Sequence, residues 1–200
     1  LADLVYRLSS RYYAFNDIML MQYIRNTFAE GVEGVDLVHH RARGFDNYYK
    51  GKVLELLVQN LFRTFRGEKL PGELFGFKSE IVVPQFSQVG SIKAKLPTTS
   101  EYEIDIYGEY EQDFEKMVWL VECKYRALKR LNKEEVERIL EAAKVVERQF
   151  AASGVVVWLI STAGFTADAL ELMRERSCLY STKEEINLLA KQYGTGITLE

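Results

Sequence analysis

The sequence predicts an α/β fold in which a mixed β-sheet is flanked by helices. Residues 102–107 alternate between apolar and polar side chains as a β-strand does, residues 117–125 form an apolar run that also reads as a strand, and a short polar connection joins the two. A helical periodicity follows, and then a continuous apolar run at residues 155–160 that is typical of a buried parallel strand. A hairpin followed by helix-linked strands predicts a mixed sheet with helices on both faces.

The predicted elements occur in the order helix, strand, strand, strand, helix, strand, helix, strand, helix. The helices are expected at residues 48–65, 133–150, 167–176 and 183–193, and the strands at 80–86, 102–107, 117–125, 155–160 and 178–181. Asp46 or Asn47 is expected to cap the first helix, and Asn132 the second. Residues 87–100 are predicted to form a polar loop.

The first 45 residues are predicted to form a small, mainly helical appendage, followed by a second domain over residues 46–200. A short strand at 4–8, a turn at 12–17 and an apolar helix at 18–28 are expected there. Residues 31–34 and 39–44 are expected to be loop and to mark the boundary. The adjacent His39 and His40 lack the Cys or further His that a transition-metal site needs.

Two charged residues end the strand predicted at residues 117–125. Alternation places Glu122 and Lys124 on the same face as Val118 and Leu120, and Cys123 on the opposite face. An unpaired charge on a core-directed face is costly, so these two side chains are expected to have a function.

A second carboxylate is expected beside this pair. Alternation in residues 102–107 places Asp105 on one face with Glu103 and Tyr107, opposite Ile104, and antiparallel pairing would bring Asp105 beside Glu122. Two carboxylates about 4 Å apart repel by about 4 kcal/mol at an effective dielectric near 20. A divalent cation reverses the sign of this interaction, and oxygen ligands suit Mg²⁺ or Mn²⁺.

The arrangement of Asp105, a hairpin and Glu122-Cys123-Lys124 resembles the PD-(D/E)XK nuclease superfamily over about residues 47–182. One position departs from the pattern, because Ile104 stands where the family often has proline. The resemblance implies a restriction endonuclease-like αβββαβ core and a Mg²⁺-dependent endonuclease that hydrolyses DNA phosphodiester bonds. Many members of the superfamily act as dimers, so a homodimer is a candidate assembly.

The same resemblance implies a role for each site residue. Asp105, Glu122 and the backbone carbonyl of Cys123 would hold Mg²⁺ or Mn²⁺, and Lys124 would position the attacking water or help to deprotonate it. Glu55, in the first helix, matches a family glutamate that orients the ligands or helps to hold a second ion. The alternative for Glu55 is an ordinary charge at the edge of a helix.

A second resemblance concerns the N-terminal region. Residues 6–8 and 13–20 resemble the end of the winged-helix region that precedes a nuclease-like domain in archaeal AAA-type ATPases. No GxxxxGK[ST] motif occurs, so any ATPase activity would reside outside these 200 residues. One alternative function is a catalytically inactive nuclease-like module of a larger ATPase that binds DNA or a partner without cutting. The other is an interaction domain of an ATPase, in which Glu122 and Lys124 are merely an ion pair on the sheet.

The net charge of the chain argues against a nucleic-acid partner, whereas the local distribution of basic residues does not. The net charge is −3 and the pI about 5.6, whereas phosphate contacts need Lys and Arg. Basic residues gather in two places, around Lys52 and directly after the predicted site, and the expected DNA contacts are Lys52, Arg126, Lys129 and Arg130. The alternative is two solvated surface patches.

The remaining features bound the class of protein. No apolar stretch of about 20 residues predicts a membrane span. Cys123 and Cys178 lie in apolar runs and are expected to be reduced and buried, which predicts a cytoplasmic protein. Cys123 is disfavoured as a nucleophile because no histidine lies near it in the sequence. The chain starts at Leu1 without Met, so we expect a fragment of a longer protein.

Overall fold

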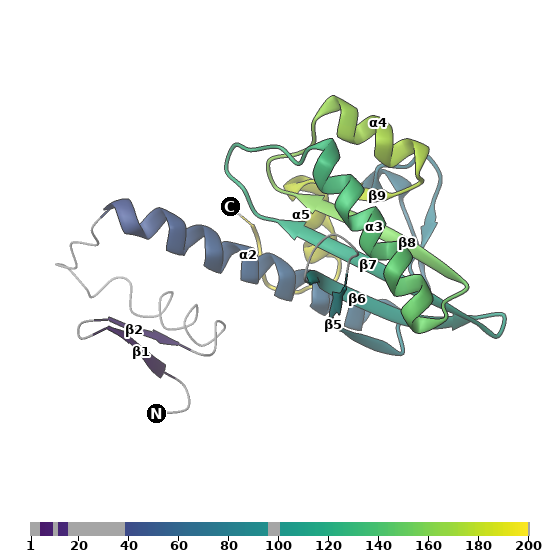
Figure 1. The fold of residues 1–200 in the computed structure, drawn as a ribbon, viewed down its shortest axis with the longest axis horizontal. Coiled ribbons are helices and arrows are strands. Elements are labelled where there is room, and N and C mark those ends of the chain that lie inside the picture. The colour runs from purple at the N-terminus through teal and green to yellow at the C-terminus, as the bar shows by residue number, and fades with distance from the viewer. Residues whose placement is uncertain (1–4, 10–11, 16–38, 96–100, 200) are drawn as a thin grey trace. The chain divides into compact units, whose positions relative to one another are not determined.

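The computed structural model describes residues 5–9, 12–15, 39–95 and 101–199 (Figure 1). Compactness divides the chain into two units, Leu1–Val53 and Leu54–Glu200. The division falls inside helix α2 (His39–Thr64), whereas the sequence predicts a boundary after residue 45.

The first unit contains a β-hairpin and the start of α2. Strands β1 (Val5–Ser9) and β2 (Tyr12–Phe15) pair in the antiparallel sense, so the turn predicted for residues 12–17 is wrong where it is described. The aromatic and β-branched character of both segments favours a strand over a turn. The helix predicted at residues 18–28 and the loop at 31–34 lie outside the described residues.

Helix α2 starts earlier than predicted. It begins at His39, so the loop expected at residues 39–44 and the cap expected at Asp46 or Asn47 are wrong. Arg41, Ala42 and Arg43 favour helix, while the single Gly44 costs only about 1 kcal/mol relative to Ala. A weak break of this size does not stop a long helix once it has formed.

The second unit is built on a five-stranded mixed sheet with the strand order β5-β6-β7-β8-β9. Its strands are β5 (Gln88–Ala94), β6 (Tyr102–Gln112), β7 (Glu115–Lys124), β8 (Gly154–Ser161) and β9 (Leu179–Ser181). The pairs from β5 to β7 are antiparallel, and those from β7 to β9 are parallel. The predicted α/β class, with a mixed sheet flanked by helices, is confirmed (Figure 1).

The first sheet strand is not where the sequence predicts it. The run at residues 80–86 contributes only β4 (Ile81–Val82), which pairs with β3 (Lys69–Leu70) in a separate small sheet. Pro84 cannot donate to a strand ladder, and this limits the run. The edge strand is β5, inside the predicted polar loop. Its lysine and serine side chains are typical of a protected sheet edge and concealed the strand pattern.

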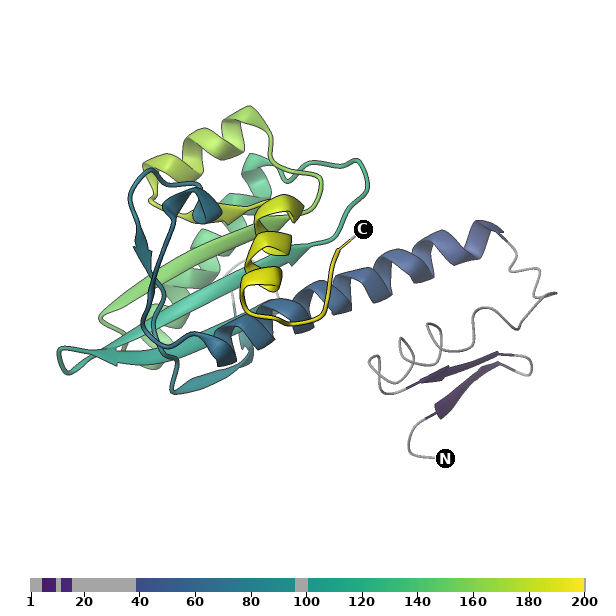
Figure 2. The same ribbon diagram turned by 180° about the vertical axis from the view of Figure 1, so that it is seen from behind.

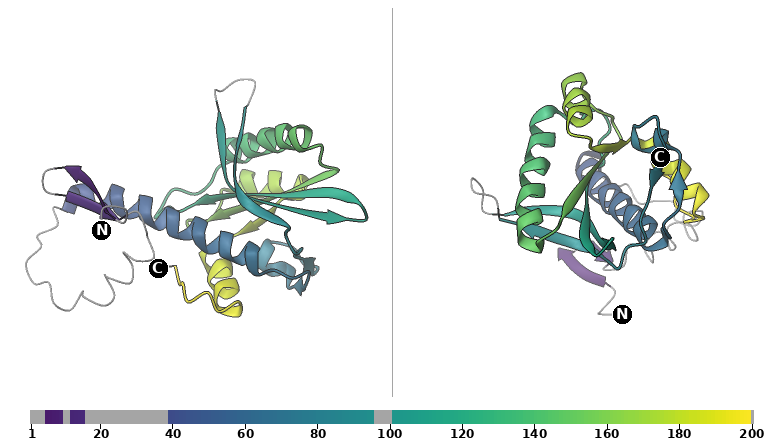
Figure 3. Two further views of the ribbon diagram at one scale, coloured as in Figure 1. Left: turned by 90° about the horizontal axis from the view of Figure 1, so that it is seen from below. Right: turned by 90° about the vertical axis from the view of Figure 1, so that its right-hand side faces the viewer.

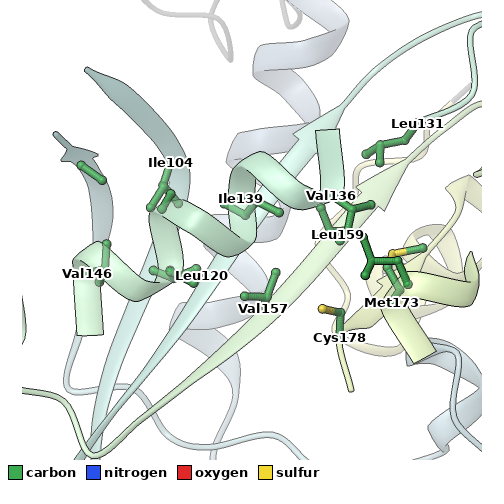
Figure 4. Packing of buried hydrophobic residues seen from close by; sticks show 14 of the residues in the cluster. Ile104, Leu120, Leu131, Val136, Ile139, Val146, Val157, Leu159, Met173 and Cys178 are labelled. Carbon is green, nitrogen blue, oxygen red and sulfur yellow. The ribbon is translucent and has the colours of Figure 1, made fainter. Parts of the chain in front are cut away.

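One face of the sheet is covered by α3 (Lys133–Phe150) and α4 (Ala167–Glu175), as the end-on view in Figure 3 shows. Asn132 caps α3 as predicted, through a reciprocal capping box with Glu135. Between helices and sheet lies a buried apolar cluster that includes Leu120, Ile139 and Leu159 (Figure 4).

The opposite face is covered by the C-terminal half of α2 from Leu54, with the short 3-10 helix η2 (Gly72–Phe75) and α5 (Lys183–Gln192) nearby (Figure 2). The predicted apolar stripe of α2 is fully buried and consists of Leu54, Leu57, Val58, Leu61, Phe62 and Phe65. Phe62 stacks on Phe86 at 4.3 Å and contacts Trp119 and Trp158. Gly108 allows this approach, since a Cβ there would lie 2.5 Å from the Phe86 ring. None of the described helices is long and apolar enough to span a membrane.

Candidate active site at the β6–β7 edge

Strand β6 contains a bulge at the position of Asp105. Gly90 pairs with Tyr107 and Ile92 pairs with Ile104, so three steps along β6 lie opposite two steps along β5. Ile104 and Tyr107 consequently both contribute to the apolar cluster under α3. The strict alternation predicted for residues 102–107, with Ile104 opposite Tyr107, is therefore wrong, because a bulge adds one residue to the period.

The bulge brings the Asp105 carboxylate between the strands. The regular β6–β7 ladder ends at the pair Ile106–Val121. Two residues beyond Val121, the backbone N–H of Cys123 donates to Asp105 Oδ2 at 2.8 Å instead of to a strand carbonyl. The negative charge of Asp105 also acts on the Glu122 carboxylate, so the two side chains are neighbours. The structure thus brings the two predicted carboxylates together.

Glu122 is buried, with only 4% of its surface exposed. Its Oε1 forms an ion pair with Lys124 Nζ, while Oε2 has no hydrogen-bond partner among the described residues. Burial, followed by the negative charge of Asp105, raises the pKa of Glu122 to about 7, against the opposing influences of Lys124 and then of the Tyr102 hydroxyl. A buried acceptor without a donor is costly, so Glu122 is the least satisfied polar group at this edge.

Lys124 lies on the same face of β7 as Glu122 and keeps 31% of its side chain exposed. Burial by itself lowers the pKa of this amine, but the Glu122 charge and hydrogen bond, helped by Asp105, outweigh it and raise the pKa. Lys124 is therefore an ammonium at neutral pH. It can donate hydrogen bonds and offset negative charge, but it has no free electron pair with which to accept a proton.

Cys123 points to the other face of β7, where its thiol is buried. Burial, followed by the charges of Asp105, Glu122 and Glu55, raises the pKa of this thiol well above its ordinary value. A thiol that resists ionisation is a poor nucleophile, in agreement with the sequence argument. In a strand the C=O of a residue points to the same side as its N–H, so the Cys123 carbonyl is directed towards β6, beyond the last ladder pair.

The other predicted acid and one predicted base lie on α2. Glu55 is half-buried and acts electrostatically on Cys123, on the α2-facing side of the sheet. Lys52 belongs to the other compact unit, Leu1–Val53. The structure therefore relates Glu55 to the neighbourhood of the Asp105–Glu122 pair.

Sequence reasoning missed Tyr102. The bulge turns this side chain towards the α3 face, where it packs on the apolar cluster. Burial and then the Glu122 carboxylate, together with Asp105, raise the pKa of its phenol, while Arg138 of α3 opposes the shift. Tyr102 thus belongs to the surroundings of Glu122, and Arg138 acts on Tyr102. No pattern in the sequence predicts that Tyr102 or Arg138 lies near the site, because strict alternation places Tyr102 on the face opposite Asp105.

The predicted DNA-contacting residues after β7 differ in their surroundings. The Arg126 guanidinium makes a two-pronged salt bridge with Glu135, one arm of which measures 2.9 Å. This contact holds the pKa of Glu135 down, at about 2. Lys129 and Arg130 have exposed side chains. Arg126 therefore has a structural partner within the chain, and Lys129 and Arg130 present their charges to solvent.

The donor atoms at this edge fit a hard cation. Among the residues that the structure describes, no three His, Cys, Asp or Glu side chains gather as a metal cluster. The two carboxylates of Asp105 and Glu122, with the Cys123 carbonyl, form instead an all-oxygen set. Oxygen ligands suit Mg²⁺ or Mn²⁺, and Glu122 Oε2 is an oxygen with no other partner in the described chain.

Comparison with known proteins adds little. No family model and no curated protein matches the chain. Among solved structures, the chain is similar to a protein of unknown function, AF1548, with a TM-score of 0.42 and 18% identity. The match covers 54% of this chain and 58% of that one, so the chain spans less than two thirds of its structural neighbour.

Proposed function

We propose that this protein is a metal-dependent nuclease that hydrolyses DNA phosphodiester bonds at the β6–β7 edge. The observation that carries the proposal is the buried Glu122 carboxylate. Among the described residues, one of its oxygens is paired with Lys124 and the other meets no hydrogen-bond donor, and a second carboxylate, Asp105, acts on it. A group of this kind is costly unless a ligand uses it.

The charge balance supports a cation as that ligand. Asp105 and Glu122 carry two negative charges when ionised, and Lys124 offsets one of them. The raised pKa of Glu122 reflects the uncompensated remainder and the burial. Asp105, Glu122 and the Cys123 carbonyl would hold Mg²⁺ or Mn²⁺. When bound, such an ion lowers the pKa of a coordinated water and polarises a phosphoryl oxygen.

The residues around the ion would have different roles in the reaction. Lys124 stays protonated and would donate a hydrogen bond to the attacking water or to the phosphate, where negative charge develops. This favours the positioning role for Lys124 over the proton-accepting one. Glu55 and Tyr102 would orient the carboxylates from either side of β7.

The test is a cleavage assay on plasmid, linear, branched and single-stranded DNA, with Mg²⁺ or Mn²⁺ and with chelator. Cutting that needs the metal is expected, and Asp105→Asn should lose it. The matched control is Glu109→Gln. Glu109 is also a carboxylate of β6, and it forms an ion pair with Lys116 of β7 at 3.1 Å, away from the proposed site. Equal activity in Asp105→Asn and Glu109→Gln would remove Asp105 from the site.

The alternative is a nuclease-like module that binds DNA or a partner without cutting, within a larger ATPase. It requires the fold but no metal. Absence of cutting on every substrate, together with absence of metal binding by titration calorimetry, would favour that alternative. In that case Glu122 and Lys124 act as an ion pair, and exchanging both for apolar residues of similar volume should be tolerated.

A further inference from the structure

The connection between β7 and α3, residues 125–131, follows the candidate site directly. It stands out from the sheet before the chain enters α3, as the teal loop in Figure 1 and the view from behind in Figure 2 show. Its middle part, residues 127–130, is exposed throughout. We call this part the site loop.

The first end of the site loop is anchored at Arg126. Its backbone N–H donates to Thr162 Oγ1 at 2.8 Å, and the Thr162 hydroxyl is 2.9 Å from the Arg126 carbonyl. The guanidinium is held by Glu135, whose carboxylate is itself part of the capping box of α3. Backbone and side chain of Arg126 therefore have separate supports.

The second end is anchored at Leu131, whose side chain is fully buried. Its N–H donates to the Gly164 carbonyl at 3.0 Å, and its own carbonyl accepts from Thr166 N–H at 3.0 Å. A parallel β-bridge to Phe165 completes this anchor. A loop fixed at both ends presents its exposed residues in a defined place and loses less conformational entropy when it binds.

The exposed residue that needs an explanation is Leu128. Its side chain is 92% exposed, although the chain has buried the next leucine, Leu131, completely. Lys129 and Arg130 follow it directly and are also exposed. An apolar side chain beside two cations matches nucleic acid, in which apolar base faces lie beside phosphates. A protein partner with the same mixed surface is less favoured, because the cations adjoin a site proposed to handle phosphodiesters.

We propose that the site loop is a wedge: Leu128 inserts against bases while Lys129 and Arg130 hold the flanking phosphates. Opening an intact duplex costs a few kcal/mol per base step. One leucine compensates such a cost incompletely, so the substrate class is DNA whose bases are already unstacked at a branch, gap or flap. This inference rests on the proposed function only in taking DNA as the substrate.

The test measures binding of the whole chain in chelator, so that cutting cannot interfere. Fluorescence anisotropy compares an intact duplex with a three-way junction whose arms contain the duplex sequence, and the fluorescence of 2-aminopurine at the branch reports whether a side chain packs against the unstacked base. The wild type should favour the junction, and Leu128→Ala should lower junction affinity by about tenfold, the order expected when part of a leucine leaves water. Duplex affinity and circular dichroism should stay unchanged.

The matched control is Leu188→Ala, since Leu188 is an exposed leucine on α5, 57% exposed. It should leave junction selectivity unchanged. The wedge is overturned if Leu128→Ala keeps the preference for the junction, if the 2-aminopurine signal is the same with the wild type and with Leu128→Ala, or if no DNA is bound. If the protein prefers the junction through Leu128 but does not cut DNA, the wedge is retained and the nuclease proposal fails. If it cuts DNA with metal but Leu128→Ala keeps the wild-type selectivity, the nuclease proposal is retained and the wedge fails.

Discussion

The Asp105 carboxylate of β6 takes the place of a strand carbonyl for the backbone N–H of Cys123 in β7, at 2.8 Å. The bulge makes this contact available, because it ends the ladder at Ile106–Val121. A candidate ligand is thereby attached to the backbone of the strand that carries its partner, Glu122. Such support fixes a side chain better than packing of its own rotamer would.

The first prediction concerns metal binding. Asp105→Asn keeps an oxygen that can accept from Cys123 but removes the charge. At Mg²⁺ about tenfold above its dissociation constant, the wild-type melting temperature should rise by about 3–6 °C relative to chelator. The variant should show no rise, while Glu109→Gln should behave as wild type. Differential scanning calorimetry measures the melting temperatures. An equal rise in the Asp105→Asn variant would exclude Asp105 as a metal ligand.

The second prediction concerns Lys124→Ala, which removes the ammonium beside Glu122. Cleavage should fall on the order of 100-fold or more, as when one preorganised donor to a transition state is lost. The fold should persist, because 31% of the Lys124 side chain is already in solvent and Glu122 can take up a proton. Rate measurements with circular dichroism test both statements. Lys116→Ala is the control, and unchanged turnover in Lys124→Ala would refute the assigned role.

The third prediction is the pH dependence of stability without metal. The folded state holds a proton on Glu122 up to about pH 7, whereas the unfolded state releases it near the ordinary value of 4.5. The folded state therefore binds more protons between these values, and the contribution of Glu122 to the free energy of unfolding falls as pH rises. Urea unfolding in chelator at about pH 5 and about pH 8 should show this loss. Glu122→Gln should flatten it, and an unaltered slope would contradict the assignment.

The fourth prediction concerns the support of the site loop. Arg126 lowers the pKa of Glu135 to about 2 in the folded state, from an ordinary 4.5. The unfolded state then binds the proton first, so the stabilisation is present above pH 4.5 and is lost as pH falls towards 2. Glu135→Gln should lessen this acid sensitivity. Glu137→Gln, on the exposed side of α3, is the control, and identical acid-unfolding midpoints for both would refute the role of Glu135.

Several elements follow from local pattern. The apolar run of β7, the Asn132 cap with Glu135 three residues on, and the apolar stripe of α2 each depend on residues close in sequence, and the structure contains all three. The edge strand β5 was missed because Ala94 alone among its residues is buried, and its Ser91 and Lys93 side chains resemble those of a loop. The start of α2 was missed because a single glycine is a weak stop signal.

The sequence by itself determined that Glu122 and Lys124 share one face of a buried strand and that Asp105 precedes it on the paired strand, because side-chain period and short connections are local properties. Only the tertiary structure decided the bulge, the hydrogen bond from Cys123 to Asp105, the position of Tyr102 near Glu122, and the pairing of Arg126 with Glu135. The bulge is a mismatch in the pairing of β5 with β6, and the contact of Asp105 crosses from β6 to β7. Arg126 and Glu135 meet because Thr162 and Gly164, far along the chain, hold the loop between them. Such relationships depend on which segments pack together, and a period along one strand carries no information about them.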